Sequence, residues 1–299
     1  MTLPSTLYGV GALLFSNTFI KLPIPPANPE LSSQTFIVTG ANTGLGYESC
    51  FHLSRLGVGK LIMAVRTTSK GDDAKKRILD ETGRDEASIE VWQIDMDSYD
   101  SVKAFAARVS ELTRLDGVLA NAGIMASNFS LSEGSEKTLN VNVISTFLLY
   151  LLLLPKMRES SLKTGNPCRY TIPNSTLHHM APLAELDPDG ENIISRLNDP
   201  EKADMAGRYA LSKLLVIYAV RELAARSTAS GKGLCILNTP NPSFCKSNLE
   251  HEKKDSRGFQ AFESLLARST EKGSRALVNG LLAGDESHGQ YLSDCVVTT

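Results

Sequence analysis

Strand and helix signals alternate along this chain from Gln34 onward, and this alternation constrains the fold more than any other feature of the sequence. Each run of β-branched and other apolar residues is followed by a segment with helical periodicity, without a long linker, a low-complexity tract or an internal repeat. Repeated βα units predict a parallel sheet that is covered by helices on both faces.

We expect strands over residues 35–40, 60–65, 89–94, 117–120, 168–173 and 233–237, and helices over residues 45–56, 70–81, 98–112, 133–157 and 207–225. Because crossovers between parallel strands are right-handed, a doubly wound sheet of the Rossmann type is the expected topology. A chain of 299 residues can form one large α/β domain or two smaller ones. The unbroken alternation favours a single domain over residues 34–299, preceded by an arm over residues 1–33.

The composition excludes several classes of protein. With 42% hydrophobic and 21% charged residues the chain has the make-up of an ordinary soluble globular protein, and its formal net charge of −2 gives no general attraction to nucleic acid or to an anionic membrane. The five cysteines have no paired spacing, which argues against a disulfide framework and against a zinc site. Such cysteines suit a reducing compartment, so we expect a cytoplasmic protein.

Two apolar runs could suggest a membrane segment. Residues 7–20 are interrupted by Ser16, Asn17 and Thr18, fall short of the ~20 residues that span a bilayer, and lack the features of a signal peptide. The proline-rich residues 22–26 then indicate an extended connector. We expect the arm to pack on the body of the protein, with shallow membrane association as the alternative. Residues 147–154 are also too few to span a bilayer, and they predict a helix that is buried on most sides. This helix could lie at a subunit contact, so a homo-oligomer is possible.

Tyr209 and Lys213 stand about one turn apart in a segment of helical period, so a helix places both side chains on one face. A phenol has a reference pKa of about 10, which makes it a poor proton shuttle at neutral pH. A neighbouring ammonium favours the phenolate, and the pair can therefore make tyrosine an acid-base catalyst. Alone, the same spacing also arises by chance on an amphipathic helix.

A glycine-rich turn lies between the first expected strand and the first expected helix, and reads Thr39-Gly40-Ala41-Asn42-Thr43-Gly44-Leu45-Gly46. Its glycines permit a tight turn and a close backbone approach, and the free amides of the helix start favour an anion. The spacing matches the Thr-Gly-x-x-x-Gly-x-Gly signature of the short-chain dehydrogenase/reductase superfamily, with Tyr209 and Lys213 in the expected downstream position. From about Thr35 to the C-terminus the chain resembles this superfamily, and most nearly its retinol-dehydrogenase-like branch and fungal secondary-metabolism relatives.

The resemblance implies cofactor contacts along the chain. Within the glycine-rich turn these are Gly40, Asn42, Thr43, Gly44, Leu45 and Gly46. Asp95 resembles the family aspartate that contacts the adenine ring, and Asn121-Ala122-Gly123 matches the segment that ends the fourth strand and supports the cofactor pocket. Pro242-Ser243 replaces the usual Pro-Gly, and Ser247 falls where a threonine often contacts the carboxamide. Loss of that glycine restricts the backbone beside the nicotinamide.

The resemblance also implies four catalytic residues. Asn142 occupies the position of the asparagine that kinks a helix and holds a water in a proton relay. Ser175 resembles the catalytic serine, although Asn174 precedes it where serine is common, and Thr176 is the second candidate. Tyr209 would protonate the developing alkoxide, while Lys213 would lower the pKa of the tyrosine and bind the nicotinamide ribose. Ser175 would orient the carbonyl oxygen.

The charge of the residues that follow the second expected strand indicates whether the cofactor is NAD or NADP. In dinucleotide folds an acidic residue at this place binds the ribose hydroxyls of NAD, whereas arginine accommodates the phosphate of NADP. Here Arg66 and Thr67 follow the strand, and no acid occurs before Asp72. A guanidinium can bind the 2′-phosphate with paired hydrogen bonds. The sequence therefore predicts NADP(H), against the alternative of a surface arginine.

A long insert between Ser175 and Tyr209 is expected to cover the substrate, together with the segment after Pro242. Its apolar residues predict a medium-sized hydrophobic or aromatic carbonyl, such as a polyketide-like intermediate, with steroids and retinoids as alternatives. His178 and His179 either contact this substrate or are structural or solvent-facing. The expected activity is reduction of a ketone or aldehyde to an alcohol. A non-redox use of the scaffold, in cyclisation or dehydration, and a cofactor-binding protein without turnover are the alternatives.

Overall fold

The first strand of the protein, β1 (Thr35–Thr39), pairs in parallel with β2 (Lys60–Val65) on one side and with β4 (Gly117–Leu119) on the other. The computed structural model describes residues 5–186, 190, 192–246 and 266–298. Within them the central sheet has eight strands in the order β10-β9-β8-β7-β4-β1-β2-β3. The remaining strands are β3 (Ile89–Gln93), β7 (Cys168–Thr171), β8 (Cys235–Asn241), β9 (Tyr291–Ser293) and β10 (Val296–Thr298). All neighbours are parallel except β9 and β10, which confirms the predicted doubly wound sheet.

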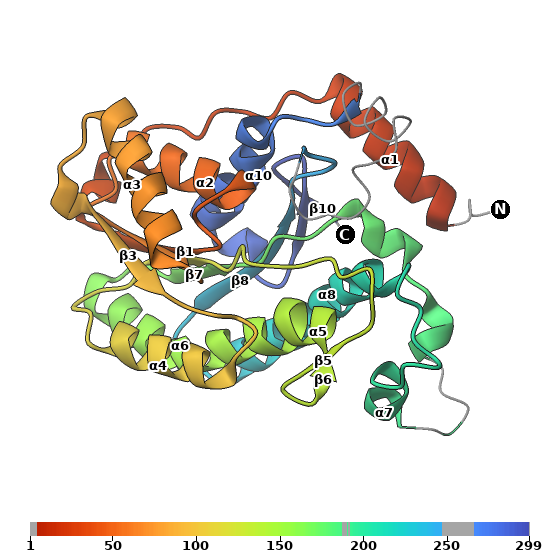
Figure 1. Ribbon diagram of the computed structural model, residues 1–299. Helices are drawn as coiled ribbons and strands as arrows, with labels where there is room; N and C mark the ends of the chain where they lie inside the picture. The colour runs from red at the N-terminus through yellow and green to blue at the C-terminus, as the bar shows by residue number, and fades with distance from the viewer. Residues whose placement is uncertain (1–4, 187–189, 191, 247–265, 299) are drawn as a thin grey trace.

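Helices cover both faces of this sheet (Figure 1). Side chains alternate along β1, so that Phe36 and Val38 pack in one core and Ile37 in the other. The core around Phe36 is closed by α2 (Gly44–Arg55), α3 (Thr68–Thr82) and α10 (Thr270–Leu282). The core around Ile37 is closed by α4 (Tyr99–Ser110), α6 (Thr146–Thr164) and α8 (Arg208–Ala229).

The structure corrects the start of the helix predicted over residues 133–157. Glu133 and Gly134 have φ angles of 51° and 77° and turn a short hairpin of β5 (Leu131–Ser132) and β6 (Ser135–Glu136). Left-handed residues cannot continue a right-handed helix, so the helical segment begins only after Glu136. It comprises α5 (Lys137–Leu139), a π-helical turn η3 (Asn140–Ser145) and α6, and it ends at the left-handed Gly165.

Among the described residues, the helix Lys137–Thr164 is long and apolar enough to cross a membrane by length and composition alone. In the structure 61% of its apolar window is buried inside the protein, where it packs on the sheet. It therefore has the character of a core helix, as the sequence predicted, although Leu151 and Leu152 project to the surface.

The arm forms a helix, α1 (Ser5–Phe19), followed by a connector and a short turn η1 (Pro29–Ser33). It lies on η4 (Thr176–Met180), the segment that follows β7. The Nδ2 atom of Asn17 donates hydrogen bonds of 2.7 Å to the carbonyl oxygens of Phe244 and Leu266, and Arg268 donates to the carbonyl of Ser16 at 2.6 Å. These contacts hold the arm against the body of the protein.

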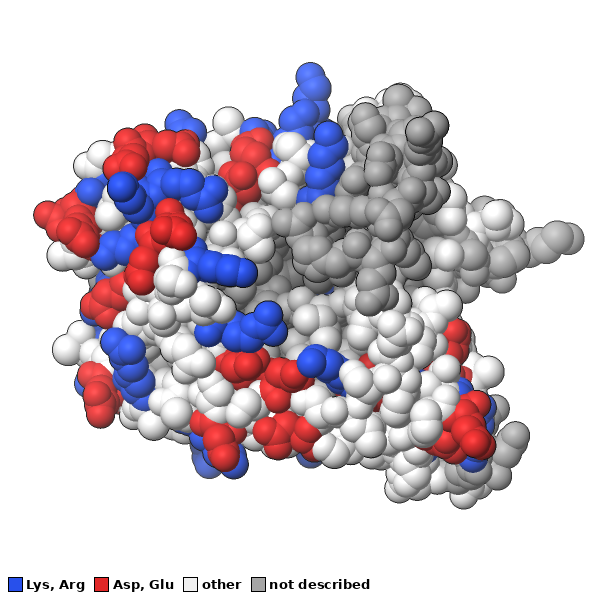
Figure 2. Space-filling model, in the orientation of Figure 1, with Lys and Arg blue, Asp and Glu red and all other residues white. Residues whose placement is uncertain are grey.

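The face shown in Figure 2 carries basic and acidic side chains mixed together. Mixed signs over this face agree with the small net charge of −2.

Candidate active site

The glycine-rich turn joins the carboxyl end of β1 to the start of α2. A Cβ on Gly46 would lie 2.3 Å from the carbonyl oxygen of Gly40 and 2.5 Å from the Nδ2 atom of Asn121, so only glycine fits there. Gly40 and Gly44 have φ angles of 64° and 59°, and a Cβ on Gly44 would meet no described atom within 4 Å. The turn thus leaves open space beside the first amides of α2, as binding of a phosphate requires.

The start of α2 itself suits an anion. Its first turn contains no acidic residue, and the side chain of Thr43 caps none of its described amides. Asn42 is half-buried and Thr43 exposed, while Leu45 packs partly into the core. The positive end of the helix dipole is therefore available to a pyrophosphate, and these residues fit a dinucleotide.

Asn121-Ala122-Gly123 lies beside this turn, at the carboxyl end of β4. The Nδ2 atom of Asn121 donates to the carbonyl oxygen of Thr39 at 3.0 Å, and the amide of Ala122 donates to the hydroxyl of Thr39 at 2.9 Å. The strand order reverses between β1 and β4, which is the place where open α/β sheets bind ligands.

Asn142 lies in the π-helical turn η3, and such turns often mark functional sites. Its Oδ1 atom accepts a hydrogen bond of 2.8 Å from the amide of Ile124. Its Nδ2 atom donates to the carbonyl oxygen of Ile124 at 2.9 Å and to the hydroxyl of Ser212 at 3.1 Å. Asn142 therefore ties the segment after Gly123 to the helix that carries Tyr209 and Lys213.

Tyr209 and Lys213 occupy the first turns of α8, with the Nζ atom of Lys213 5.5 Å from the ring centroid of Tyr209. Tyr209 is half-buried and Lys213 is buried. Burial lowers the pKa of Lys213 from 10.5 to about 8, so the side chain is still mainly an ammonium at neutral pH. Its Nζ donates to the carbonyl oxygen of Pro173 at 2.8 Å.

Ser175 follows β7 and begins η4, on which α8 packs. Its amide donates to the Oδ1 atom of Asn174 at 2.8 Å, and its half-buried hydroxyl accepts from the amide of Leu177 at 3.2 Å. Thr176, the second candidate, is buried, and its hydroxyl accepts a hydrogen bond of 2.9 Å from Asn241 on β8. The geometry favours Ser175, because the hydroxyl of Thr176 is engaged inside the protein.

His178 and His179 pack in a column of rings between α1 and β9. The centroid distances are 5.1 Å from Tyr8 to His179, 3.9 Å from His179 to His178, and 4.9 Å from His178 to Tyr291. The Nδ1 atom of His178 lies 2.7 Å from the carbonyl oxygen of Ser175. Burial lowers the pKa of His178 to about 4, and also lowers that of His179. Both rings support η4, which agrees with the structural interpretation.

Three other predicted cofactor contacts, Arg66, Asp95 and Pro242, follow the carboxyl ends of β2, β3 and β8. Arg66 is exposed directly after β2, and Asp95 is half-buried beyond β3, where its Oδ1 accepts from the amide of Asp97 at 3.0 Å. Pro242 is buried after β8, and Ser243 takes a φ of 63°, the left-handed conformation that the usual glycine would adopt freely. Ser247 lies outside the described residues.

Two supporting residues were missed by sequence reasoning. Asn174 donates from Nδ2 to the carbonyl oxygen of Lys213 at 3.2 Å and to the hydroxyl of Thr239 at 3.0 Å, while Ser212 receives the hydrogen bond of Asn142. The sequence showed Asn174 only as a departure from the usual serine, and nothing in the sequence singled out Ser212. Both residues are adjacent in the sequence to a motif residue, and this adjacency was the only feature of the sequence that could have indicated their role.

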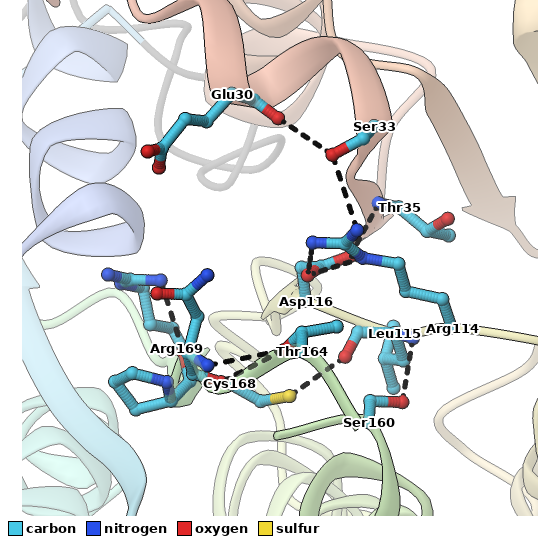
Figure 3. Close-up of polar contacts among 12 residues, drawn as sticks. Glu30, Ser33, Thr35, Arg114, Leu115, Asp116, Ser160, Thr164, Cys168 and Arg169 are labelled. Carbon is cyan, nitrogen blue, oxygen red and sulfur yellow. Dashed lines mark hydrogen bonds and ion pairs between the residues drawn. The ribbon is translucent and has the colours of Figure 1, made fainter. Parts of the chain in front are cut away.

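A cavity of about 580 Å³ lies elsewhere, at the amino-terminal edge of the sheet. Its lining includes Gln34, just before β1, and Arg169 at the start of β7. Figure 3 shows this edge, where Arg114 and the amide of Thr35 both bind the carboxylate of Asp116. Parallel strands bind ligands at their carboxyl ends, so this cavity is not the candidate active site.

Known proteins resemble this chain over nearly its whole length. A family model described as short chain dehydrogenase matches residues 34–166. The short chain dehydrogenase/reductase dmxR8 of Cryptosporiopsis sp. is 42% identical over 290 residues, which cover 96% of this chain and 88% of that protein. The short chain dehydrogenase atnD of Emericella nidulans is 40% identical over 286 residues, which cover 94% of this chain and 89% of that protein.

Solved structures share the fold. One, described as a short chain dehydrogenase from Escherichia coli CFT073 complexed with NADPH, has a TM-score of 0.63 and 20% sequence identity. The match covers 90% of this chain and 99% of that one. At this identity the likeness concerns the fold alone.

Proposed function

The chain belongs to the short-chain dehydrogenase family of oxidoreductases, and from this premise we propose that it is an NADPH-dependent reductase that converts a ketone or aldehyde to an alcohol. The observation that carries the proposal is the position of Lys213. Its buried ammonium lies 5.5 Å from the ring of Tyr209 and is hydrogen-bonded to Pro173, two residues before Ser175. These contacts join the candidate acid and its charged partner to the segment that carries the candidate serine, which supports the proposal.

Bound NADPH supplies the hydride for such a reduction. Tyr209 donates its phenolic proton to the oxygen that becomes the alcohol. The ammonium of Lys213 favours the anionic form of the phenol and so makes that proton easier to release. Ser175 donates a hydrogen bond from its hydroxyl to the same oxygen, which orients the carbonyl and stabilises the charge that develops there.

Asn142 contributes by holding parts of the site together. Both hydrogens of its amide are used, one by the carbonyl of Ile124 and one by Ser212, and its oxygen accepts from the amide of Ile124. Asn142 therefore keeps α8 against the π-helical turn. A water that relays protons at this residue would therefore find both hydrogens of the side-chain amide already in use.

We propose NADP(H) over NAD(H) because of Arg66. Its exposed side chain follows β2 at the edge where the turn Gly40–Gly46 lies, and no carboxylate stands in that position to repel a 2′-phosphate. A guanidinium there can bind the phosphate with two hydrogen bonds. The Escherichia coli structure of the same fold is complexed with NADPH, which is consistent with this choice.

The proposed substrate is a medium-sized hydrophobic carbonyl compound, such as a polyketide-like intermediate. The insert between Ser175 and Tyr209 carries exposed apolar side chains at Met180, Leu183 and Ile194. It comprises η4, η5 (Leu183–Leu186) and α7 (Ile193–Leu197). Exposed apolar groups next to the site favour an apolar ligand.

A single-turnover experiment tests the proposed function. The protein is mixed with NADPH and a panel of ketones and aldehydes, and the NADPH absorbance band is followed while the product is identified. Loss of the band with an equal amount of alcohol supports the reductase. A product formed without NADPH oxidation would indicate cyclisation or dehydration instead, and NADPH binding without any product would indicate a sensor.

A further inference from the structure

Three charged side chains are buried where the insert, the π-helical segment and α8 meet. The side chains of Arg208 and Glu136 are 0% exposed, and that of Glu185 is 7% exposed. The Nε atom of Arg208 lies 3.8 Å from Oε2 of Glu136, and its Nη2 atom lies 3.5 Å from Oε1 of Glu185. One buried arginine thus faces two carboxylates from two different segments of the chain.

Each carboxylate also binds the backbone. Glu136 accepts hydrogen bonds from the amides of Thr138 at 2.8 Å and Leu139 at 3.1 Å, and so fixes the start of the helical segment that carries Asn142. The Oε1 atom of Glu185 accepts from the amide of Asp204 at 2.7 Å.

The far end of the insert is held in turn by Asp204. Its Oδ1 atom accepts a hydrogen bond of 3.1 Å from the amide of Gly207, the residue that precedes α8. A Cβ on Gly207 would lie 2.8 Å from Pro182, so the insert packs directly on this end of the helix. Glu185 therefore contacts both the residues that lead into α8 and its first residue, Arg208.

Arg208 is followed directly by Tyr209. Burial of charges is costly, and an apolar cluster of similar volume would often stabilise a fold as well or better. What three paired charges provide instead is one defined arrangement, because an ion left without its partner inside the protein is strongly unfavourable. The arrangement here sets the start of α8 relative to both the insert and the helix of Asn142.

We propose that Arg208 is a positioning residue, whose pairing with Glu136 and Glu185 couples the substrate-covering insert to the alignment of Tyr209. The inference rests on the reductase function proposed above, since it gives Tyr209 the role of the acid. Arg208 does not touch the reacting atoms. Its ion pairs instead make the position of Tyr209, which does contact the reacting oxygen, depend on the position of the insert.

The test compares Glu185→Gln with a matched control, Glu111→Gln, which makes the same chemical change on an exposed residue directly after α4, outside the insert. We expect Glu185→Gln to lower kcat by about 10- to 100-fold, because small misplacements of a reacting group have effects of this size. KM and the Kd of NADPH, followed by its fluorescence, should stay within about twofold of the original values. Glu111→Gln should match the unchanged protein in kcat, KM and the Kd of NADPH.

Hydrogen exchange provides a readout that does not depend on activity. In Glu185→Gln, peptides that cover residues 183–186 and 207–213 should both exchange faster, while peptides from β1 and β2 keep their rates.

Arg208→Lys, which retains the charge but loses the planar fork, should recover part of the kcat that Arg208→Met loses.

The outcomes separate the two proposals. A Glu185→Gln protein with reduced thermal stability but unchanged kcat would overturn the positioning role and leave the reductase intact. If no carbonyl compound is reduced by the unchanged protein, the proposed function fails. The coupling is then judged by exchange alone, and unchanged rates at 207–213 in Glu185→Gln would overturn it. Should Arg208→Met fail to fold, Glu185→Gln and Arg208→Lys carry the test.

Discussion

The ammonium of Lys213 donates a hydrogen bond to the carbonyl oxygen of Pro173 at 2.8 Å, and so joins α8 to the segment that leads into Ser175. Asn174 makes the reverse connection, since its Nδ2 atom donates to the carbonyl oxygen of Lys213 at 3.2 Å. The candidate acid, its charged partner and the candidate serine are therefore held by reciprocal contacts between two segments that are far apart in the sequence.

The depressed pKa of Lys213 predicts a stability that depends on pH. Burial lowers this pKa from 10.5 to about 8, so between these values the unfolded chain binds more protons than the folded one. Stability then rises with pH from about 8 to 10.5, and the full penalty is present below pH 8. Unfolding by urea at pH 7.5 and 9.5 should show a gain of at most about 2 kcal/mol that Lys213→Met lacks. The same pH dependence in both proteins would contradict the shift.

Tyr209→Phe should abolish most of the activity. The phenylalanine keeps the ring but removes the proton donor, and kcat should fall by about 10²- to 10⁴-fold while the Kd of NADPH is unchanged. Tyr218→Phe, on an exposed tyrosine of the same helix, is the control and should be fully active. Undiminished turnover by Tyr209→Phe would exclude the tyrosine as the acid.

The two neighbouring hydroxyls should respond differently to removal. Ser175→Ala should reduce kcat by about 10²- to 10³-fold, because its hydroxyl acts on the carbonyl oxygen, and should lower the free energy of unfolding by at most about 1 kcal/mol through the hydrogen bond that Leu177 loses. Thr176→Ala should lower the free energy of unfolding by about 1 to 3 kcal/mol and leave kcat nearly unchanged, because it deprives Asn241 of a buried acceptor. The opposite pattern in kinetics and urea unfolding would assign the catalytic role to Thr176.

Arg66→Ala should weaken the binding of NADPH and leave the binding of NADH unchanged. Loss of a charged hydrogen-bonded contact to the 2′-phosphate should raise the Kd of NADPH by about 10- to 100-fold. Arg226→Ala, which removes an exposed arginine from the far end of α8, serves as the control. Fluorescence titration with both nucleotides measures the effect, and equal losses for NADPH and NADH would argue against selection through the 2′-phosphate.

Ser243→Gly should stabilise the protein. Ser243 has a φ of 63°, which costs a residue with a Cβ about 1 kcal/mol more than it costs glycine. Thermal unfolding should therefore shift upward by about 2 to 4 °C. Ser243→Ala keeps the strain and loses only a buried hydroxyl that makes no described hydrogen bond, so it should reproduce at most part of the gain. Equal melting temperatures for the glycine and alanine variants would show that the strain is not relieved.

Local patterns in the sequence predicted the six central strands and the helices between them, because apolar periodicity reflects which face of an element is buried. The glycine-rich turn could also be predicted, since Gly46 leaves no room for a side chain. The start of the helical segment near Glu133 was wrong, because the left-handed turn at Glu133 and Gly134 was not read as one. The helix α10 and the strands β9 and β10 were not predicted at all.

The sequence alone determined the doubly wound fold, the order of the candidate site residues and the family resemblance that links them. Their chemical roles stay predictions until the variants are measured. Only the tertiary structure decided that Thr176 faces β8, that Lys213 is desolvated, and that Arg208 lies between two buried carboxylates. Periodicity and motifs depend on residues that are close in the chain, whereas burial and charge pairing depend on residues that folding alone brings together.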